Sequence, residues 1–116
     1  KLSGSIIIST PQDVALIDAR KGINMFKKVN VPVLGIVENM SYFICSKCNE
    51  RHEIFSSGGA KKEAEKFETP FLGELPLDKN LRIYSDEGRP ICVSDSESSI
   101  AATYLAIAKK VHGNLH

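Results

Sequence analysis

Residues 5–13 read SIIISTPQD and combine the signals of a strand and of a helix start. The three isoleucines, residues 6–8, place β-branched apolar side chains on both sides of an extended chain, which is typical of a strand covered on both faces in a parallel sheet. The hydroxyl of Thr10, the ring of Pro11 and the acid of Asp13 then predict a helix whose N-cap is Thr10. The stretch therefore predicts a buried strand that turns directly into a helix.

A second strand completes this unit. The predicted helix has one apolar face, made of residues at spacings of three and four, and should end near residues 29–30. Residues 31–37 form a second apolar run and predict another buried strand. Because a strand, a helix and a strand joined by short links form a right-handed parallel unit, the sequence predicts an α/β fold. The helix face consists of Leu16, Ala19, Ile23 and Phe26.

The periodicity breaks after this strand. Residues 40–57 fit no long element, and we predict that they form a loop inserted in the domain, a small hairpin with two cysteines at its tip. The glycine pair at residues 58–59 then precedes a short helix with Ala60, Ala64 and Phe67 on one face.

The last third of the chain predicts one more strand and two helices. Residues 71–75 form the strand, residues 79–87 a short helix, and residues 94–97 (SDSE) a capping box for the final helix. Three strands are few for a parallel sheet flanked by helices, so we expect residues 1–116 to be part of a larger single domain. One side of the final helix is lined by Ile100, Tyr104, Ile107, Ala108 and Val111.

The composition excludes several classes of function. The 116 residues include 15 Lys and Arg against 14 Asp and Glu, and this net charge of +1 gives no field that would favour nucleic acid or an anionic membrane. No apolar run has the length of a membrane-spanning helix, and the sequence does not open on a signal-peptide pattern. We therefore expect a cytoplasmic protein with neither a nucleic-acid nor a membrane partner.

Two of the three cysteines, Cys45 and Cys48, form a C-x-x-C pair, which in a reducing compartment points to metal or redox chemistry. A turn of this spacing brings both sulfurs to the same side, but zinc and four-iron clusters generally take four ligands. A second copy of the chain supplies the other two most simply. A zinc site, a thiol redox pair, an inert pair and a contribution from His52 are the alternatives. Cys92 lies in an apolar run and is predicted to be buried packing.

Polar residues follow two of the predicted strands. Asn39 stands where open α/β sheets place ligand-binding groups, and its amide could read adenine. Alternatively, it only ends the strand and caps a turn. Pro76 and Asp78 follow the next strand and are predicted to form the other wall of the same pocket. Glu38 is interpreted as structural. Four apolar residues flank the cysteines and are predicted to pack locally or on a dimer surface: Tyr42, Phe43, Ile54 and Phe55.

Several long motifs in matching order resemble the Mrp/ApbC/NBP35 family over about residues 4–110. They are STPQDVAL at residues 9–16, VPVLGIVENMSYF at residues 31–43 with the C-x-x-C that follows, and FLGELPLD at residues 71–78. Members of this family are deviant-Walker P-loop ATPases, related to the MinD-like proteins, that act as carriers or scaffolds for iron–sulfur clusters.

The resemblance implies a function and a set of ligands. Cys45 and Cys48 would hold a [4Fe-4S] cluster that bridges the two subunits of a homodimer and passes to apo iron–sulfur proteins. Asn39 would lie at the base pocket for ATP, which the family binds with Mg. Zinc in place of the cluster, as in a zinc-stapled interaction module, is the alternative.

The family's phosphate loop, with its lysines, and its magnesium and water-positioning aspartates lie upstream of the point that matches Gly4. The chain is therefore expected to be the C-terminal half of such an ATPase, with no catalytic residue and no ATP hydrolysis of its own. Residues 58–62 (GGAKK) lack the spacing of a phosphate loop and are interpreted as a turn and a helix start. A MinD-like positioning ATPase would need an amphipathic membrane tail, which residues 109–112 (KKVH) do not provide.

Overall fold

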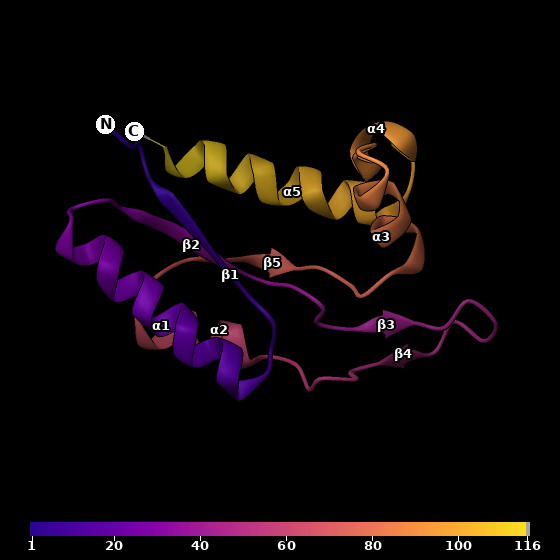
Figure 1. Cartoon of the computed structure of the whole chain (residues 1–116), viewed down its shortest axis with the longest axis horizontal. Helices are drawn as coiled ribbons and strands as arrows, with labels where there is room; N and C mark the ends of the chain where they lie inside the picture. The colour runs from indigo at the N-terminus through magenta and orange to yellow at the C-terminus, as the bar shows by residue number, and fades with distance from the viewer. Residues whose placement is uncertain (116) are drawn as a thin grey trace.

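Three parallel strands form the centre of the molecule, in the order β1-β2-β5. They are β1 (Ser5–Ser9), β2 (Val33–Glu38) and β5 (Phe71–Glu74) in the computed structural model, which describes residues 1–115 (Figure 1). β2 is the middle strand, and five of its six residues are buried, as its apolar sequence requires. The predicted α/β class and all three predicted sheet strands are confirmed.

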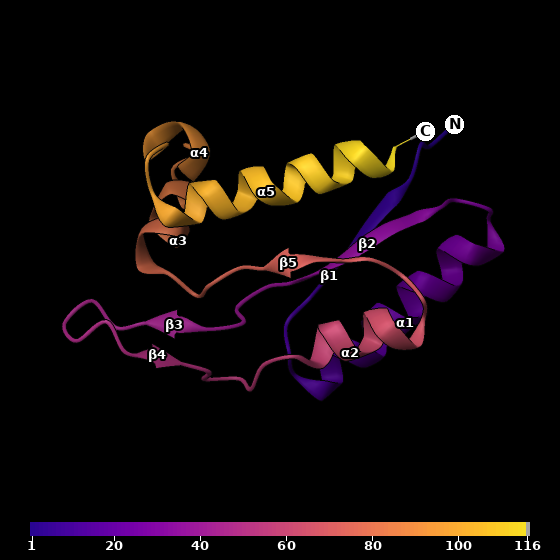
Figure 2. The same ribbon diagram turned by 180° about the vertical axis from the view of Figure 1, so that it is seen from behind.

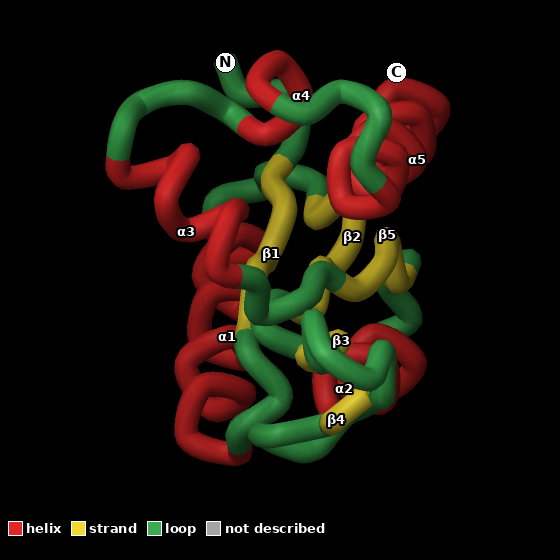
Figure 3. The backbone as a smooth tube through the Cα atoms, turned by 90° about the vertical axis from the view of Figure 1, so that its right-hand side faces the viewer, coloured by secondary structure: helices red, strands yellow, loops and turns green. Residues whose placement is uncertain are grey.

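Helices cover the two faces of this sheet. α1 (Asp13–Lys28) and α2 (Gly59–Lys66) lie on one face and α5 (Ser99–Asn114) on the other, as Figure 2 shows from behind and Figure 3 from the hairpin end. The short helices α3 (Lys79–Asp86) and α4 (Ile91–Ser94) follow β5. The core under α1 and α2 consists of Ile7, Leu16, Ala19, Ile23, Ile36, Ala60 and Ala64. The core under α5 consists of Val37, Leu72 and Leu75, against which Tyr104, Ile107 and Val111 pack.

The expected cover of the first strand on both faces is wrong for β1. Ile7 is buried against α1, but the side chains of Ile6 and Ile8 on the other face are 40% and 64% exposed. The reason is that α5 crosses β2 and β5 and does not extend over β1. β2 and β5 contact helices on both faces of the sheet, whereas β1 is covered on one face by α1.

The first predicted helix start is displaced. α1 begins at Asp13 after Gln12, and the hydroxyl of Thr10 donates to Gln12 Oε1 at 3.0 Å instead of capping the helix.

The predicted capping box at residues 94–97 is also wrong. The hydroxyl of Ser94 donates to the carbonyl of Arg89 at 3.1 Å, because residues 91–94 have already formed α4. The cap of α5 is Ser98, whose hydroxyl oxygen accepts from Ala101 N at 3.1 Å. Cys92 lies in α4 and is only half-buried, so its predicted full burial is not observed.

The predicted cysteine hairpin is confirmed. β3 (Phe43–Ile44) and β4 (Arg51–His52) pair in antiparallel fashion and project from the end of the parallel sheet (Figure 1). The ladder contains only two residue pairs, Phe43 with His52 and Ile44 with Arg51. The chain leaves β2 through Met40, whose φ of 54° is in the left-handed region that residues with a Cβ rarely adopt.

The longest helices of residues 1–115, α1 and α5, have 16 residues each, and neither they nor the shorter helices qualify as a membrane span.

Candidate functional site

The turn at the hairpin tip holds Cys45 and Cys48. Cys45 N donates to the carbonyl of Glu50 at 3.0 Å, and Asn49 N donates to the carbonyl of Cys45 at 2.8 Å. Asn49 closes the turn with a φ of 58°, a conformation that asparagine tolerates better than most residues. Both cysteines are free thiols, Cys48 being exposed and Cys45 half-buried. The turn therefore presents two sulfurs at the most outlying part of the fold.

The backbone of this turn favours the charged form of one thiol. The pKa of Cys45 is lowered because the backbone N–H groups of Cys48 and Lys47, and then the thiol of Cys48, hydrogen-bond to its sulfur. The thiolate is the form of cysteine that metal ligation requires, and this turn favours it at Cys45.

A single copy of the chain does not complete a metal site. Among residues 1–115, no group of three or more His, Cys, Asp or Glu side chains is placed to hold a metal ion. His52 lies beside Phe43, with ring centroids 6.4 Å apart, and its Nε2 is 3.7 Å from Glu50 Oε2. The structure therefore does not bring His52 into a common ligand set with the two cysteines.

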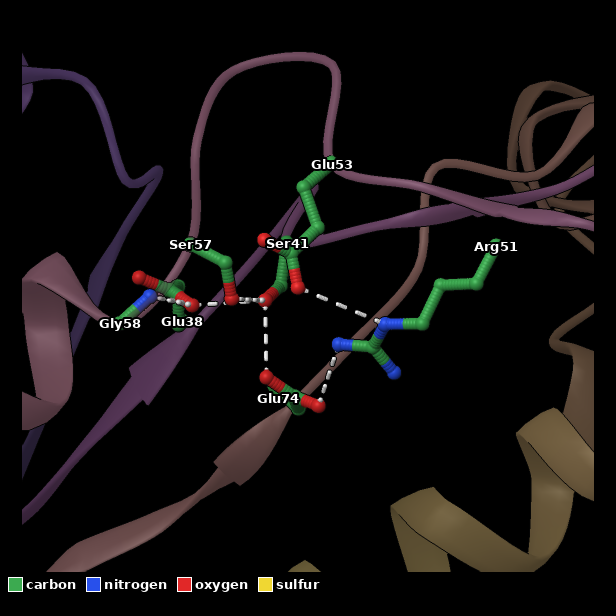
Figure 4. A network of polar contacts seen from close by, with 7 residues as sticks. All are labelled: Glu38, Ser41, Arg51, Glu53, Ser57, Gly58 and Glu74. Atoms are coloured by element: carbon green, nitrogen blue, oxygen red, sulfur yellow. Dashed lines mark hydrogen bonds and ion pairs between the residues drawn. The ribbon is translucent and has the colours of Figure 1, made fainter.

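A polar network joins the hairpin to the ends of β2 and β5 (Figure 4). The buried hydroxyl of Ser41 lies 2.6 Å from Glu38 Oε2 and 2.9 Å from Glu74 Oε2, so it bridges the two strands. Glu38 is fully buried and also accepts from Gly58 N at 3.2 Å and Ala60 N at 3.1 Å, at the start of α2. The structural role predicted for Glu38 is confirmed.

Arg51 holds the hairpin side of this network. Its Nη2 donates to Glu74 Oε1 at 3.0 Å, its Nε lies 3.7 Å from Glu53 Oε1, and its guanidinium stacks 4.0 Å from the ring centre of Tyr42. The pKa of Arg51 is raised mainly by the hydrogen bond to Glu74. Burial, and then the charge of Glu74, raise the pKa of Tyr42. Sequence analysis missed Arg51 and Glu74, because their pairing across 23 positions leaves no periodic signal.

A cavity of about 510 Å³ opens beside the hairpin, at the carboxyl ends of the strands. Asn39, Pro76 and Asp78 all line it, so the structure brings together the three residues predicted from separate parts of the sequence. The remaining lining is largely apolar, including Leu77 and Leu81, which suits one flat organic ring better than a hydrated ion.

Two of these residues are held by contacts of their own. The backbone N–H of Asn39 donates to the carbonyl of Ser9 at 2.8 Å, which fixes the residue at the end of β2. The carboxylate of Asp78 accepts from Leu81 N at 2.9 Å and so caps α3. Asp78 therefore shapes the wall of the cavity by starting this helix.

The sequence is similar to proteins that are named as carriers or transfer proteins for iron–sulfur clusters. The profile of the ParA family described as NUBPL iron-transfer P-loop NTPase matches residues 1–112. The iron-sulfur cluster carrier protein of Escherichia coli K12 is 51% identical over 115 residues, 99% of this chain and 31% of that protein. The iron-sulfur cluster transfer protein NUBPL of Mus musculus is 50% identical over 110 residues, 95% of this chain and 34% of that protein. The chain thus spans about a third of the length of these curated relatives.

Two solved structures are similar in fold. A nucleotide-binding protein from Archaeoglobus fulgidus in complex with ADP, with Co found by PIXE, has a TM-score of 0.68 and 40% identity, and covers 83% of this chain and 38% of its own. The cell division ATPase MinD of Pyrococcus furiosus has a TM-score of 0.74 at 22% identity, and covers 96% of this chain and 43% of its own. At that identity, the likeness to MinD concerns the fold alone.

Proposed function

The chain belongs to the ParA family of NUBPL iron-transfer P-loop NTPases, and we propose that it is the cluster-binding and base-binding part of an iron–sulfur cluster carrier. The observation that carries this proposal is the turn at the hairpin tip, closed by the bond from Asn49 N to the carbonyl of Cys45, which holds the free thiols of Cys45 and Cys48. The relatives named as cluster carriers and transfer proteins, at about half identity over nearly the whole chain, support the same function.

The cargo of this carrier would be shared between two copies. Cys45 and Cys48 supply two thiolates, and the same two residues of a second copy would supply the other two that a [4Fe-4S] cluster needs. Since the turn is exposed and its hairpin is short, an acceptor can approach the cluster and replace these ligands. We infer that the homodimer delivers its cluster to apo iron–sulfur proteins in a reducing compartment such as the cytoplasm, where free thiols persist.

The cavity at the end of the sheet would take the base of ATP in the full-length protein. Asn39 would read the adenine edge, while Pro76 and the start of α3 at Asp78 would flank the ring. The related structure that contains ADP supports a nucleotide site. In this proposal residues 1–116 form the C-terminal part of a single nucleotide-binding α/β domain, with residues 40–57 inserted as the cysteine-bearing loop. The magnesium and phosphate ligands, and hydrolysis itself, would belong to the rest of that domain.

Anaerobic reconstitution tests the cluster proposal. Full-length protein incubated with iron and sulfide should form a brown dimer with about two iron atoms per chain, as one four-iron cluster shared by two chains requires. Cys45→Ser and Cys48→Ser should each abolish this species, whereas the control Cys92→Ser, in α4, should retain it. Iron uptake by the Cys45→Ser and Cys48→Ser proteins equal to that of the wild type would exclude this site. Stoichiometric zinc with no brown species would favour a zinc-stapled module instead.

A further inference from the structure

The base cavity and the cysteine hairpin share a wall. Phe43 in β3 and Ile54 just beyond β4 both line the cavity, together with Pro76 and Leu81 from the segment that follows β5. Phe43 also lies only two positions before Cys45. A ligand in this cavity would therefore touch the element that carries the sulfurs.

The base of the hairpin is bonded to the same segment that lines the cavity. Ser41 N donates to the carbonyl of Leu75 at 2.9 Å, and Leu77 N donates to the carbonyl of Tyr42 at 2.7 Å. These two bonds fix the chain immediately before Phe43. Backbone hydrogen bonds thus link the position of Phe43 to the segment that forms the cavity wall.

Beyond its base, the hairpin is tied to the sheet by the partly exposed pair of Arg51 and Glu74. Its ladder has two residue pairs, and Ile54 is 56% exposed although it lines the cavity. A two-stranded ribbon of this size is marginal by itself. A flat ring placed in the cavity would bury apolar surface of Phe43 and Ile54, and that gain would favour one position of the hairpin over the others.

Resting on the proposed function, we propose that Phe43 and Ile54 are positioning residues through which an adenine base in the cavity orders the cysteine hairpin. Nucleotide occupancy then sets how firmly Cys45 and Cys48 are presented to a second copy of the chain. Because linkage between two binding sites is reciprocal, a cluster held by the cysteines tightens nucleotide binding by the same factor.

Hydrogen exchange in the full-length, metal-free and reduced protein tests this coupling without any cluster. ADP with Mg should slow exchange of the amides of residues 43–54 by about tenfold, which is within the usual range for linked sites. Pyrophosphate, which lacks the base, should leave these amides unchanged. The amides of α1 serve as an internal reference, because no residue of α1 lines the cavity.

Variants separate the positioning role from a merely structural one. Phe43→Ala and Ile54→Ala should each bind ADP up to about tenfold more weakly, the loss of one good aromatic or apolar contact, and should lose the ADP-dependent protection. Ile44→Ala is the matched control, because Ile44 is in the same hairpin, is 43% exposed and does not line the cavity. Ile44→Ala should keep both the wild-type affinity for ADP and the ADP-dependent protection of the hairpin amides. If Phe43→Ala unfolds the protein, Ile54→Ala decides, since that side chain is largely exposed.

The outcomes also separate the two proposals. ADP binding with no change in hairpin exchange overturns the coupling and leaves the proposed function intact. Unchanged ADP-dependent protection in both Phe43→Ala and Ile54→Ala overturns it as well. If ADP does not bind at all, it is the proposed base site that fails.

Discussion

The parallel sheet and the cysteine hairpin of this chain are stabilised in opposite ways. The sheet buries Ile23, Ile36 and Leu72 almost completely, and its middle strand is covered by helices on both faces. The hairpin has two residue pairs, exposed apolar side chains such as Ile44, and charged groups at its base. The fold thus separates a closely packed sheet from a sparsely supported hairpin, and the two meet at the network of Glu38, Ser41 and Glu74.

Truncating one isoleucine in each region should give the largest contrast. Ile36→Ala removes a side chain that is 1% exposed in the middle strand, and we expect a loss of about 2–5 kcal/mol in the free energy of unfolding. Ile44→Ala, at 43% exposure, should cost about 0.5 kcal/mol or less. Urea denaturation of both variants measures the difference. Equal losses would mean that the hairpin is part of the cooperative core.

The second prediction concerns the sheet side of the junction. Glu38→Gln keeps the shape of the side chain, but its amide NH2 group must face a backbone donor, the N–H of Gly58 if it replaces Oε2 or the N–H of Ala60 if it replaces Oε1. An unpaired buried donor costs about 1–3 kcal/mol, measured by urea denaturation. Glu65→Gln on the exposed side of α2 is the control and should be neutral. A neutral Glu38→Gln would show that these donors have other partners.

The third prediction concerns the hairpin side. Arg51→Gln removes the guanidinium that pairs with Glu74 and stacks on Tyr42. Because Arg51 and Glu74 are 42% and 36% exposed, the loss of global stability should be below about 1 kcal/mol. Hydrogen exchange in residues 42–54 should nevertheless become several-fold faster. Arg82→Gln, which breaks the exposed pair with Asp86 in α3, is the control and should leave hairpin exchange unchanged.

The smallest predicted effect concerns the reactivity of the Cys45 thiol at the tip of the hairpin. Since hydrogen bonds lower the pKa of Cys45 below that of an ordinary thiol, alkylation of Cys45 should begin at lower pH than in the unfolded protein. Because the pKa of Cys45 is lower in the folded protein than in the unfolded one, the Cys45 thiolate contributes to stability above the pKa of the unfolded state. This contribution is lost as the pH falls through the pKa of the folded state. Mass spectrometry of the alkylated peptides between about pH 6 and 9 measures the shift. Coincident profiles for folded and urea-unfolded protein would contradict it.

Local patterns in the sequence were sufficient for much of this architecture. Short apolar runs predicted the strands, and the spacing of Leu16, Ala19 and Ile23 predicted the buried face of α1. The position of Asn39 after one strand and Pro76 after another also predicted their meeting in one cavity, because parallel strands end at the same edge.

The features that were missed depend on competition between distant groups. The hydroxyls of Thr10 and Ser94 both look like helix caps locally, but each has a different partner in the fold. One face of β1 is exposed because α5 packs on β2 and β5, and the position of this helix cannot be predicted from the sequence of β1 alone. The Arg51–Glu74 pair joins the hairpin to the end of β5, and the sequence around either residue carries no local signal of this pairing.

The left-handed conformation of Met40 at the exit of β2 bears on the direction in which the hairpin leaves the sheet. A glycine would adopt its φ of 54° at no steric cost, yet glycine would also let the chain leave the strand along many other paths. A residue with a Cβ instead prefers negative φ, so the left-handed backbone of Met40 costs about 1 kcal/mol. The hydrogen bonds on either side, from Asn39 N to the carbonyl of Ser9 and from Ser41 N to the carbonyl of Leu75, therefore impose the path along which the chain turns into the hairpin.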